Sequence, residues 1–504
     1  MEWVIANMAP LMFGALVLFL LFGYPVAFAL AANGIVFGLL GIELGLLQPA
    51  LFQALPERIF GIMGNDTLLA IPFFTFMGLI LERSGMAEDL LDTIGQLFGP
   101  MRGGLAYAVI FVGALLAATT GVVAASVISM GLISLPIMLR YGYDRRLASG
   151  TIAASGTLAQ IIPPSLVLIV LADQMGRSVG DMYEGAMIPG LMLAGMYFAY
   201  VFAVTLIRPS AAPALPPEAR TLKGFKLAQR VVFTLFPPLL LIFLVLGTIF
   251  IGVATPTEGG AMGAAGALIL AFVNRRLNLG LLRQAMDTTA KLSAFVIFIL
   301  IGATCFSLTF NGAKGDHWVE ELLTQLPGGW LGFLIIVNLM VFLLAFFLDF
   351  FELAFIIVPL LAPTALKVLT PVAAMYLGVP PGVAEKYAMI WFGVLLGVNM
   401  QTSFMHPPFG FALFYLRSVA PEKPYVDKVT GKETAPVTTG QIYWGAVPYV
   451  VIQLVAVVVL IAAPSLVWTG MDKPRAVNPD RPISVPSVPR APEDDDSPGL
   501  PKIR

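Results

Sequence analysis

Two proline pairs interrupt long apolar stretches of this chain, and they constrain its fold more than any other feature. Pro163-Pro164 lies in the first half and Pro407-Pro408 in the second. Proline removes a backbone donor and clashes with the carbonyl four residues back, so a proline pair ends a helix. In hydrocarbon, the freed polar groups persist only where they line a cavity or are buried in protein. Paired interruptions at matching positions of two halves indicate the binding site of a secondary transporter.

The composition is typical of a polytopic membrane protein. Of the 504 residues, 58% are hydrophobic and only 12% are charged, whereas a soluble domain carries about 25% charged residues. A net charge of -1 gives no reason to expect a nucleic-acid partner. The single cysteine, Cys305, excludes a disulfide. The two histidines leave no room for a bis-histidine haem or a zinc triad. We therefore expect no cofactor.

The apolar stretches have unusual lengths. Several are too long for one span of about 20 residues and too short for two. The run 103–139 is predicted to be a re-entrant hairpin with its tip near Gly121, and the run 330–369 a second hairpin with its tip near Asp349. The first run contains Gly23-Tyr24-Pro25, and one span or two are both compatible with it. It lacks a small-residue cleavage site, so we expect it to be retained. The stretches are 10–47, 65–82, 103–139, 147–174, 182–207, 231–252, 256–273, 288–310, 330–369, 386–417 and 441–468.

The basic residues concentrate in four short loops, at 140–146, 208–230, 275–283 and 417–432. Basic short loops stay on the cytoplasmic side of a membrane. If both hairpins are re-entrant, the chain crosses the membrane an even number of times between successive basic loops. All four loops then lie on the same side of the membrane. The hairpins then open to opposite sides of the membrane. The sequence thus predicts an all-α polytopic membrane protein of inverted repeats, each with a re-entrant helical hairpin and a broken helix.

The two halves also share local features. The sequence Ala87-Glu88-Asp89-Leu90-Leu91 resembles 319–323, Gly103-Gly104 resembles Gly328-Gly329, and we expect Pro136 and Pro359 to close the two hairpins. Scaffold helices are predicted at 1–82 and 182–310, and an amphipathic interfacial helix at 84–98. The two transport halves are predicted at 103–174 and 330–417, and their broken helices at 147–174 and 386–417. A C-terminal transmembrane helix is predicted at 441–468, and a disordered, proline-rich tail at 471–504.

Each interruption offers small polar side chains beside backbone groups that a regular helix would pair. Half-helix N-termini favour anions, whereas unwound carbonyl groups can hold Na⁺. Hard oxygen ligands suit an alkali cation better than a transition metal. For any single hydroxyl, the alternative is a hydrogen bond within its own helix or a packing contact. We predict cation ligands at Thr120, Gly121, Ser126, Asp349, Glu352 and Thr402. We predict substrate contacts at Thr119, Thr157, Gln160, Pro163, Pro164, Ser165, Gln401, Ser403, His406 and Pro407.

Asp349 and Glu352 lie deep in an apolar run, where a carboxylate costs about 3 kcal/mol. They are expected to be cation ligands or proton carriers; the alternatives are an interfacial position or a pair with Lys or Arg. His406 is expected to contact substrate, to titrate, or only to pack. Glu258 has the pattern of a helix-start residue, and Gly259, Gly263 and Gly266 form a stripe for close helix packing. His317 is expected in an exposed loop.

Several short runs resemble one transporter family. They are Leu69-Ala70-Ile71-Pro72-Phe73-Phe74, Arg102-Gly103-Gly104-Leu105-Ala106, Gly142-Tyr143, Ile161-Ile162-Pro163-Pro164-Ser165, Leu348-Asp349, Asn399 and Pro407-Pro408-Phe409-Gly410. Over residues 10–468 the chain resembles the large membrane subunit, DctM-like, of tripartite ATP-independent periplasmic (TRAP) transporters. The resemblance implies an elevator-type, Na⁺-coupled importer of an organic acid in the bacterial inner membrane. It also implies two partners, a small four-helix membrane subunit and a soluble periplasmic binding protein.

The chain departs from the family pattern at three positions. Thr120-Gly121-Val122-Val123 stands where the family has Ser-Gly-Ser-Ser, Gln401 replaces a common acidic residue, and His406 replaces a common Thr. These departures suggest a subgroup that handles keto acids, aromatic acids or polyols. Two other functions stay open: a stand-alone dicarboxylate or ion transporter, and a membrane enzyme that uses Asp349 and Glu352. No Walker A motif is present, so the chain does not itself hydrolyse ATP, and we expect no enzymatic activity.

Overall fold

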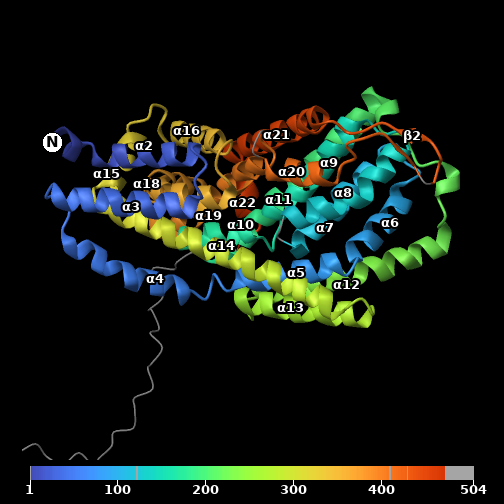
Figure 1. Ribbon diagram of the computed structural model, residues 1–504, viewed down its shortest axis with the longest axis horizontal. Coiled ribbons are helices and arrows are strands. Elements are labelled where there is room, and N and C mark those ends of the chain that lie inside the picture. Colours follow the sequence, from blue (N-terminus) through green and yellow to red (C-terminus); the bar gives the residue numbers. More distant parts are fainter. Residues whose placement is uncertain (1, 121–122, 408–409, 428, 472–504) are drawn as a thin grey trace, which may run out of the picture. The chain divides into compact units, whose positions relative to one another are not determined.

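The computed structural model describes residues 2–120, 123–407, 410–427 and 429–471. Most of them are helical (Figure 1). Within this part of the chain, eight helices are long and apolar enough to cross a membrane. The predicted class, an all-α polytopic membrane protein, is confirmed.

The first apolar stretch forms two helices. A turn at Gly23, with φ of +77°, and Pro25 at the start of the next helix separate them. Of these two helices, Val26–Glu43 is long and apolar enough to span a membrane and Met8–Leu21 is shorter, so one span plus a short helix and two spans both stay open. The elements of this part are α1 (Glu2–Ala6), α2 (Met8–Leu21), α3 (Val26–Glu43), η1 (Pro49–Ala54), α4 (Leu55–Met63), α5 (Ala70–Arg83) and α6 (Met86–Phe98).

The run that begins at residue 103 is a re-entrant hairpin. Its two open ends meet at one short segment, because the amide of Gly103 donates to Ala212 O and the amide of Asp144 donates to Ala211 O, both at 2.8 Å. A broken helix follows the hairpin, as the proline pair predicts. The elements are α7 (Gly104–Thr120), α8 (Val123–Arg140), α9 (Arg145–Thr157), η2 (Leu158–Gln160), α10 (Leu166–Gln174) and α11 (Val179–Ile207).

The middle of the chain packs against the N-terminal helices. Helix α13 runs along α5, and the long helix α14 runs along α3 (Figure 1). A Cβ at Gly263 would lie 2.4 Å from Met77 Sδ, and Thr255 and Glu258 form a reciprocal capping box. Both predicted structural roles, the glycine stripe and the helix start, are thus confirmed. The elements are η3 (Pro209–Ala211), η4 (Pro217–Ala219), α12 (Gly224–Phe250), α13 (Pro256–Val273) and α14 (Leu279–Gly312).

The second hairpin and second broken helix repeat the first pair. Gly328, with φ of +93°, precedes α16 as Gly103, with φ of +77°, precedes α7. Helix α18 continues past residue 369 to Leu377, and Gly378 ends it with φ of +66°. The elements are α15 (Gly315–Thr324), α16 (Gly329–Leu344), α17 (Phe350–Glu352), the π-helical turn η5 (Leu353–Ile357), α18 (Val358–Leu377), α19 (Pro381–Met400), η6 (Gln401–Phe404) and α20 (Phe411–Val419).

Three sequence-based expectations about this region are wrong. Pro136 lies inside α8, and Pro359 lies inside the continuous return arm, so neither closes a hairpin. Helices buried in membrane proteins tolerate proline where neighbours and local π turns satisfy the backbone, and the π turn directly before Pro359 widens the helix there. His317 is exposed as expected, but it belongs to α15 and not to a loop, because the amphipathic pattern of 315–324 continues through it.

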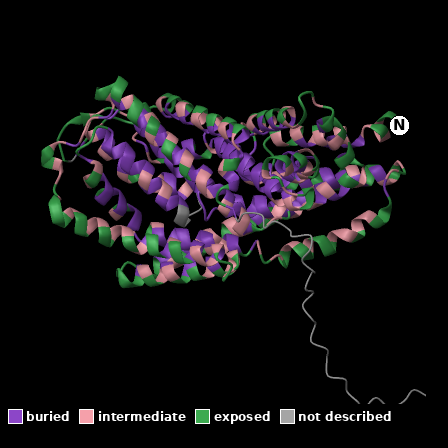
Figure 2. Ribbon diagram, turned by 180° about the vertical axis from the view of Figure 1, so that it is seen from behind, coloured by how far each residue is buried: buried purple, intermediate pink, exposed green. Residues whose placement is uncertain are grey.

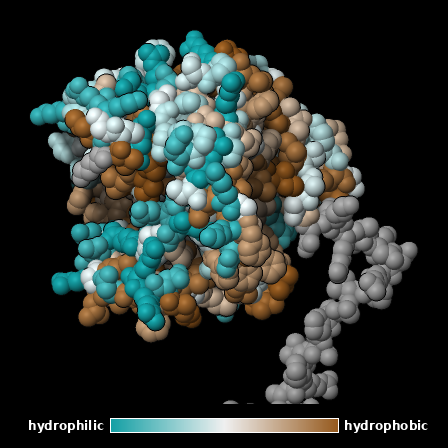
Figure 3. Space-filling view, turned by 90° about the vertical axis from the view of Figure 1, so that its right-hand side faces the viewer, coloured by the Kyte–Doolittle hydropathy of each residue, from teal (hydrophilic) through white to brown (hydrophobic). Residues whose placement is uncertain are grey.

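The four basic loops lie at one end of the molecule. Arg230 and Arg276 form ion pairs with Asp92 and Asp89 of α6, at 2.8 Å each. At the same end, Arg140 pairs with Asp427 at 2.9 Å, beside the short antiparallel strands β1 (Tyr425–Val426) and β2 (Glu433–Thr434). Figure 3 shows hydrophilic side chains gathered over this end. Figure 1 places α15 and α16, where the second hairpin opens, at the opposite end.

The Asp427 carboxylate anchors this end of the chain. Burial alone would raise the pKa of Asp427, but hydrogen bonds from Thr430 and Arg140 outweigh it and hold that pKa at about 2. The last elements are α21 (Thr439–Ala462) and α22 (Ser465–Trp468).

The most buried segments are the two broken helices. Figure 2 shows burial concentrated in the centre, and every residue of 147–170 and 387–403 is buried. Helix α11 packs on α7, α10, α19 and α21 as well as on α12. The division into scaffold and transport segments stays a prediction.

Close packing of α9 on α21 yields a test of the fold. A Cβ at Gly150 would lie 2.0 Å from the Gly445 carbonyl oxygen. Because this oxygen belongs to the backbone, the clash can be relieved only if the two helices move apart. We expect Gly150→Ala to destabilise the protein by about 3 kcal/mol, measured as a lower thermal unfolding midpoint in detergent. Gly195→Ala is the control, because nothing lies within 4 Å of its new methyl group. Equal midpoints for the two variants would contradict the close approach of α9 and α21.

Candidate functional site

The first helix break runs from the end of α9 to the start of α10. Ser165 caps α10, since its hydroxyl accepts a 3.4 Å hydrogen bond from Leu168 N, and the same hydroxyl donates to the Gln160 carbonyl. Thr157 donates to Ala154 O at 2.8 Å. The hydroxyls of Ser165 and Thr157 are therefore engaged locally. Pro163 and Pro164 between them are buried.

The second break runs from the end of α19 to the start of α20. Thr402 Oγ1 donates to Asn399 O at 2.7 Å. The Asn399 amide donates to the carbonyl and side-chain oxygens of Asn338 in α16, at 2.7 and 3.0 Å. Asn338 was not among the predicted site residues. Its position as the single amide side chain within the apolar run 330–347 is the signal that could have identified it.

The side-chain amide of Gln401 joins the two breaks. Gln401 Nε2 donates to the Thr157 carbonyl at 2.7 Å and to Thr157 Oγ1 at 3.3 Å. Both side chains are at least 99% buried. The carbonyl that accepts this bond is one of those freed where α9 ends. The breaks of the two halves thus meet at one place, although 244 positions separate these residues.

Several buried oxygens around this junction lack a hydrogen-bond partner within the described residues. They are Ser155 Oγ, Asn399 Oδ1, Gln401 Oε1 and Ser403 Oγ. Leaving a buried acceptor unpaired costs about 1–3 kcal/mol, so such groups call for a ligand. All are hard oxygen donors, which suit an alkali cation. No group of three or more His, Cys, Asp or Glu side chains with metal-binding geometry occurs in the part of the chain that the structure describes.

Asp349 and Glu352 form a capping box at the return arm of the second hairpin. Asp349 Oδ1 accepts from Glu352 N at 2.9 Å, and Glu352 Oε2 accepts from Asp349 N at 2.9 Å. No ion pair with Lys or Arg is found for either carboxylate among the described residues. Both residues are half-buried. The pair therefore starts a helix, which was not among the roles considered, and its contact with a cation stays a prediction.

His406 packs between two aromatic rings of α16 and the turn after it. Its ring stacks on Phe346 with centroids 4.0 Å apart and meets Phe342 edge-on at 4.6 Å. The side chain is 98% buried, and neither ring nitrogen has a hydrogen-bond partner within the described ranges. Packing is thus the role that the geometry favours, and contact with substrate stays a prediction.

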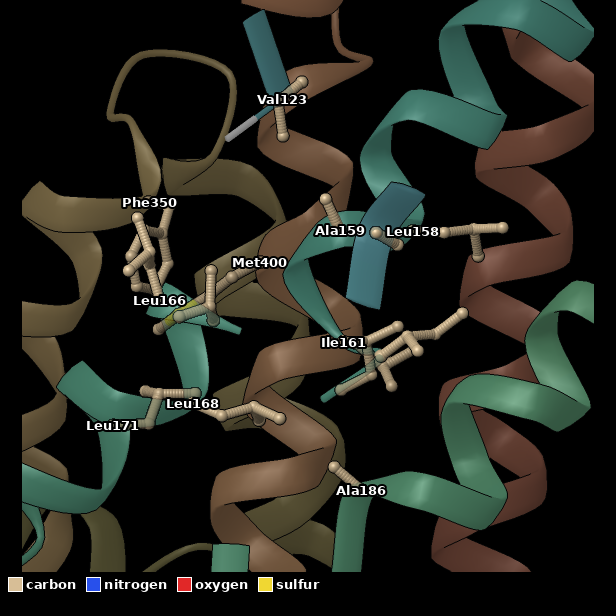
Figure 4. Close-up of a cluster of buried hydrophobic side chains, with 14 of the residues drawn as sticks. Val123, Leu158, Ala159, Ile161, Leu166, Leu168, Leu171, Ala186, Phe350 and Met400 are labelled. Carbon is tan, nitrogen blue, oxygen red and sulfur yellow. The ribbon is translucent and has the colours of Figure 1, made fainter. Parts of the chain in front are cut away.

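A cavity of about 210 Å³ lies between the two halves and α14. Asp349 and Gln160 supply polar groups to it, and six aromatic rings supply most of its wall. Figure 4 shows the apolar packing beside it, where Phe350 and Met400 of the second half approach Leu166 of the first. The lining residues are Val123, Ala124, Gln160, Leu166, Leu292, Phe295, Asp349, Phe350, Phe351, Phe404, Phe411 and Tyr415.

The remaining predicted residues have different outcomes. Ser126 is buried in α8, and Pro407 is half-buried after the second break. Gly121 and Pro408 lie outside the described residues, as do the side chains of Thr119 and Thr120. The aromatic lining from α14 and α20, such as Phe295 and Tyr415, was missed, because nothing in an apolar helix marks which ring faces a cavity.

The fold and the paired breaks define a membrane transporter of the inverted-repeat class. The model of the DctM component of tripartite ATP-independent periplasmic transporters matches residues 13–466. The chain belongs to this family, and it is a multi-pass membrane permease component, not an enzyme.

Relatives support this assignment. The chain is 28% identical over 433 residues to the C4-dicarboxylate TRAP transporter large permease protein DctM of Pseudomonas aeruginosa, covering 84% of this chain and 92% of that one. It is 26% identical to the sialic acid TRAP transporter large permease protein SiaM of Vibrio cholerae, covering 79% and 86%. It is 28% identical to the isethionate TRAP transporter permease protein DctMQ of Oleidesulfovibrio alaskensis, covering 82% and 61%.

The fold also resembles a solved structure. The YdaH transporter of Alcanivorax borkumensis superimposes with a TM-score of 0.52 at 17% identity, covering 83% of this chain and 88% of that one. At this identity the similarity concerns the fold alone.

Proposed function

We propose that this chain is the large permease subunit of a Na⁺-coupled TRAP transporter that imports an organic acid across the bacterial inner membrane. The observation that carries the proposal is the junction of the two breaks. Gln401 and Thr157 join them, buried oxygens without partners surround them, and a cavity lies between the same two halves. Unwound carbonyls and half-helix ends at such a junction suit a cation and an anionic substrate.

The aromatic wall of the cavity supports a substrate with an apolar body. Phe295, Phe351 and Tyr415 are among six rings that line it, and no Lys or Arg lines it among the described residues. The negative charge of an organic acid would then be balanced by Na⁺ and by helix ends. Keto acids and aromatic acids fit this lining better than polyols, which need many hydrogen bonds.

An elevator movement of the hairpins and broken helices is part of the proposal. Several polar contacts join the segments predicted to move to those predicted to stay, and two of them involve α5 or the loop before it. Asn65 Nδ2 donates to Asp173 Oδ1 at 2.7 Å, and Ser129 Oγ donates to Glu82 Oε1 at 3.1 Å. Asn65 lies in the loop before α5 and Glu82 in the last turn of α5, whereas Asp173 lies in the last turn of α10 and Ser129 in α8. Sliding of one set past the other would break both contacts.

A cross-link tests this movement. We expect the pair Asn65→Cys and Asp173→Cys, oxidised to a disulfide, to lower uptake at least tenfold, because it ties α10 to the loop before α5. Reduction is expected to restore uptake, and each single cysteine variant is the control. Cys305 is buried and is replaced by alanine in all of these proteins. Full uptake by the oxidised pair would contradict the elevator mechanism.

The proposal includes two partners. A small membrane subunit joins the scaffold, and a periplasmic binding protein delivers the substrate. One relative carries the name DctMQ and is longer than this chain.

The test of the function is uptake into liposomes that contain this chain and its small subunit. We expect labelled organic acid to accumulate only with an inward Na⁺ gradient and the cognate binding protein present. A K⁺ gradient of equal size is the control. Uptake that needs neither Na⁺ nor the binding protein would overturn the proposal and favour the second candidate, a stand-alone dicarboxylate transporter.

A further inference from the structure

A second cavity, of about 840 Å³, lies among the basic loops. Three separate elements form it: the turn and first residues of α9, the last turns of α11 with η3, and the start of α21. Its lining residues are Gly142, Tyr143, Asp144, Arg145, Arg146, Leu147, Tyr200, Val204, Ile207, Arg208, Ser210, Ala211, Gln441, Trp444, Gly445 and Pro448. Its volume is in the range of small-molecule sites, about 300–1,000 Å³.

The charge of this cavity is uneven. Arg145, Arg146 and Arg208 line it against one carboxylate, Asp144. That carboxylate already caps α9, since Asp144 Oδ1 accepts from the amides of Arg146 and Leu147 at 2.9 and 3.0 Å. None of the three arginines forms an ion pair with another described residue, whereas Arg140, close by in sequence, pairs with Asp427. The Arg145 Nε atom is buried and has no hydrogen-bond partner there.

The positions of the arginines argue for a ligand. Basic residues gather in cytoplasmic loops whatever their role, so their presence alone says little. However, Arg145 and Arg146 occupy the first turn of α9, where the helix dipole favours negative groups and disfavours cations. A bound anion would offset this unfavourable placement, and guanidinium groups match the geometry of phosphate.

The wall of the cavity changes from charged to apolar. Tyr200 lies on α11 about two turns before Arg208, and Trp444, in the second turn of α21, is 65% exposed. Farther along α21, on either side of Pro448, Val447 and Val451 are 41% and 52% exposed. Aromatic side chains with a polar tip mark the level of the headgroups in a bilayer. The exposed aliphatic side chains then continue into the hydrocarbon region, where acyl chains would lie.

We propose that this cavity binds the headgroup of an anionic phospholipid of the inner leaflet. The phosphate would lie among Arg145, Arg146 and Arg208, and the acyl chains would lie along α11 and α21. Basic pockets between transmembrane helices on the cytoplasmic side bind such headgroups. The lipid would hold together the ends of α9, α11 and α21, which meet here. This proposal is independent of the transported substrate.

The first measurement is lipid binding by the purified full chain in detergent, followed by native mass spectrometry and thermal unfolding. We expect phosphatidylglycerol to bind and to raise the unfolding midpoint, and phosphatidylcholine to do neither. Soluble glycerol phosphate supplies the same phosphate without acyl chains. If it raises the midpoint as much as phosphatidylglycerol does, the site is a free-phosphate site and the lipid assignment is overturned.

Arginine variants locate the site. Each arginine changed to glutamine is expected to weaken phosphatidylglycerol binding about fivefold, and the variant Arg145→Gln/Arg146→Gln/Arg208→Gln is expected to lose the stabilisation. The matched control is Lys223→Gln/Lys226→Gln/Arg283→Gln, which removes equal charge from exposed residues that do not line the cavity. If the triple arginine variant does not fold, the exposed single change Arg146→Gln still gives the fivefold measurement. Equal lipid binding by the arginine variants and the control would overturn the proposal.

Discussion

Asp349→Ala is expected to reduce substrate uptake about 100-fold, because it removes the cap that fixes the return arm of the second hairpin beside the cavity. The variant loses the acceptor for Glu352 N, which destabilises a helix start by about 1 kcal/mol. Asp349 also lines the cavity, and small displacements of groups around a substrate can lower rates about 100-fold. Uptake is measured in liposomes at saturating Na⁺, at equal protein insertion.

The variant Asp349→Asn distinguishes the capping role of Asp349 from the role of its negative charge. Asn caps a helix as well as Asp does, so Asp349→Asn is expected to keep the thermal stability of the wild type. If the carboxylate attracts Na⁺, this variant needs about tenfold more Na⁺ for half-maximal uptake, which corresponds to about 1.4 kcal/mol. An Asp349→Asn variant with unchanged Na⁺ dependence would remove Asp349 from the predicted cation ligands and leave it a helix cap.

A second capping box provides the matched control for Asp349→Ala. Thr255 and Glu258 make the same reciprocal pair at the start of α13, and neither lines the cavity. Thr255→Ala is expected to lower stability to a similar extent and to leave uptake within twofold of the wild type. Equal losses of uptake in both variants would show that the effect of Asp349→Ala comes from stability alone.

Gln401→Leu is expected to abolish uptake and to lower the free energy of unfolding by about 2 kcal/mol. The change leaves the buried Thr157 carbonyl without the donor at 2.7 Å, and an unpaired buried acceptor costs about 1–3 kcal/mol. It also separates the two helix breaks. Both effects are measured on the same preparation, by thermal unfolding in detergent and by uptake in liposomes.

The matched control for Gln401→Leu is Gln453→Leu. Gln453 is an equally buried glutamine whose Nε2 donates to the Tyr197 hydroxyl at 2.9 Å, but it lies in α21 and belongs to neither break. We expect a comparable loss of stability with uptake retained. If Gln401→Leu transports normally despite its lost hydrogen bond, the junction of the breaks is not the functional site.

The architecture was largely predictable because its causes are local. A proline pair disfavours a helix interior, and Pro163-Pro164 predicted the break between α9 and α10. By contrast, the pair Pro237-Pro238 lies inside the continuous helix α12. Basic loops share one side of a membrane, so the positions of Arg283 and Arg417, on either side of the run 330–369, predicted that the second hairpin is re-entrant. The expectation that Pro136 and Pro359 close the two hairpins was wrong, because a buried helix tolerates a single proline when neighbouring helices pack against it.

The site was less predictable because its contacts are long-range. The sequence identified Thr157 and Gln401 as polar residues at breaks. No sequence pattern predicts that two residues 244 positions apart form a hydrogen bond. The role of Asp349 was predictable, since Asp349-Phe350-Phe351-Glu352 has the spacing of a capping box. The stacking of His406 on Phe346 depends on tertiary packing and left no local signal.

The most direct test of the proposed coupling is entry of radiolabelled Na⁺ into liposomes driven by an inward substrate gradient, with the small subunit and binding protein present. We predict substrate-dependent Na⁺ entry for the wild type, normal entry for Gln453→Leu, and none for Gln401→Leu. Substrate accumulation by the wild type without any Na⁺ entry would contradict a cation and substrate site at the junction of the two broken helices.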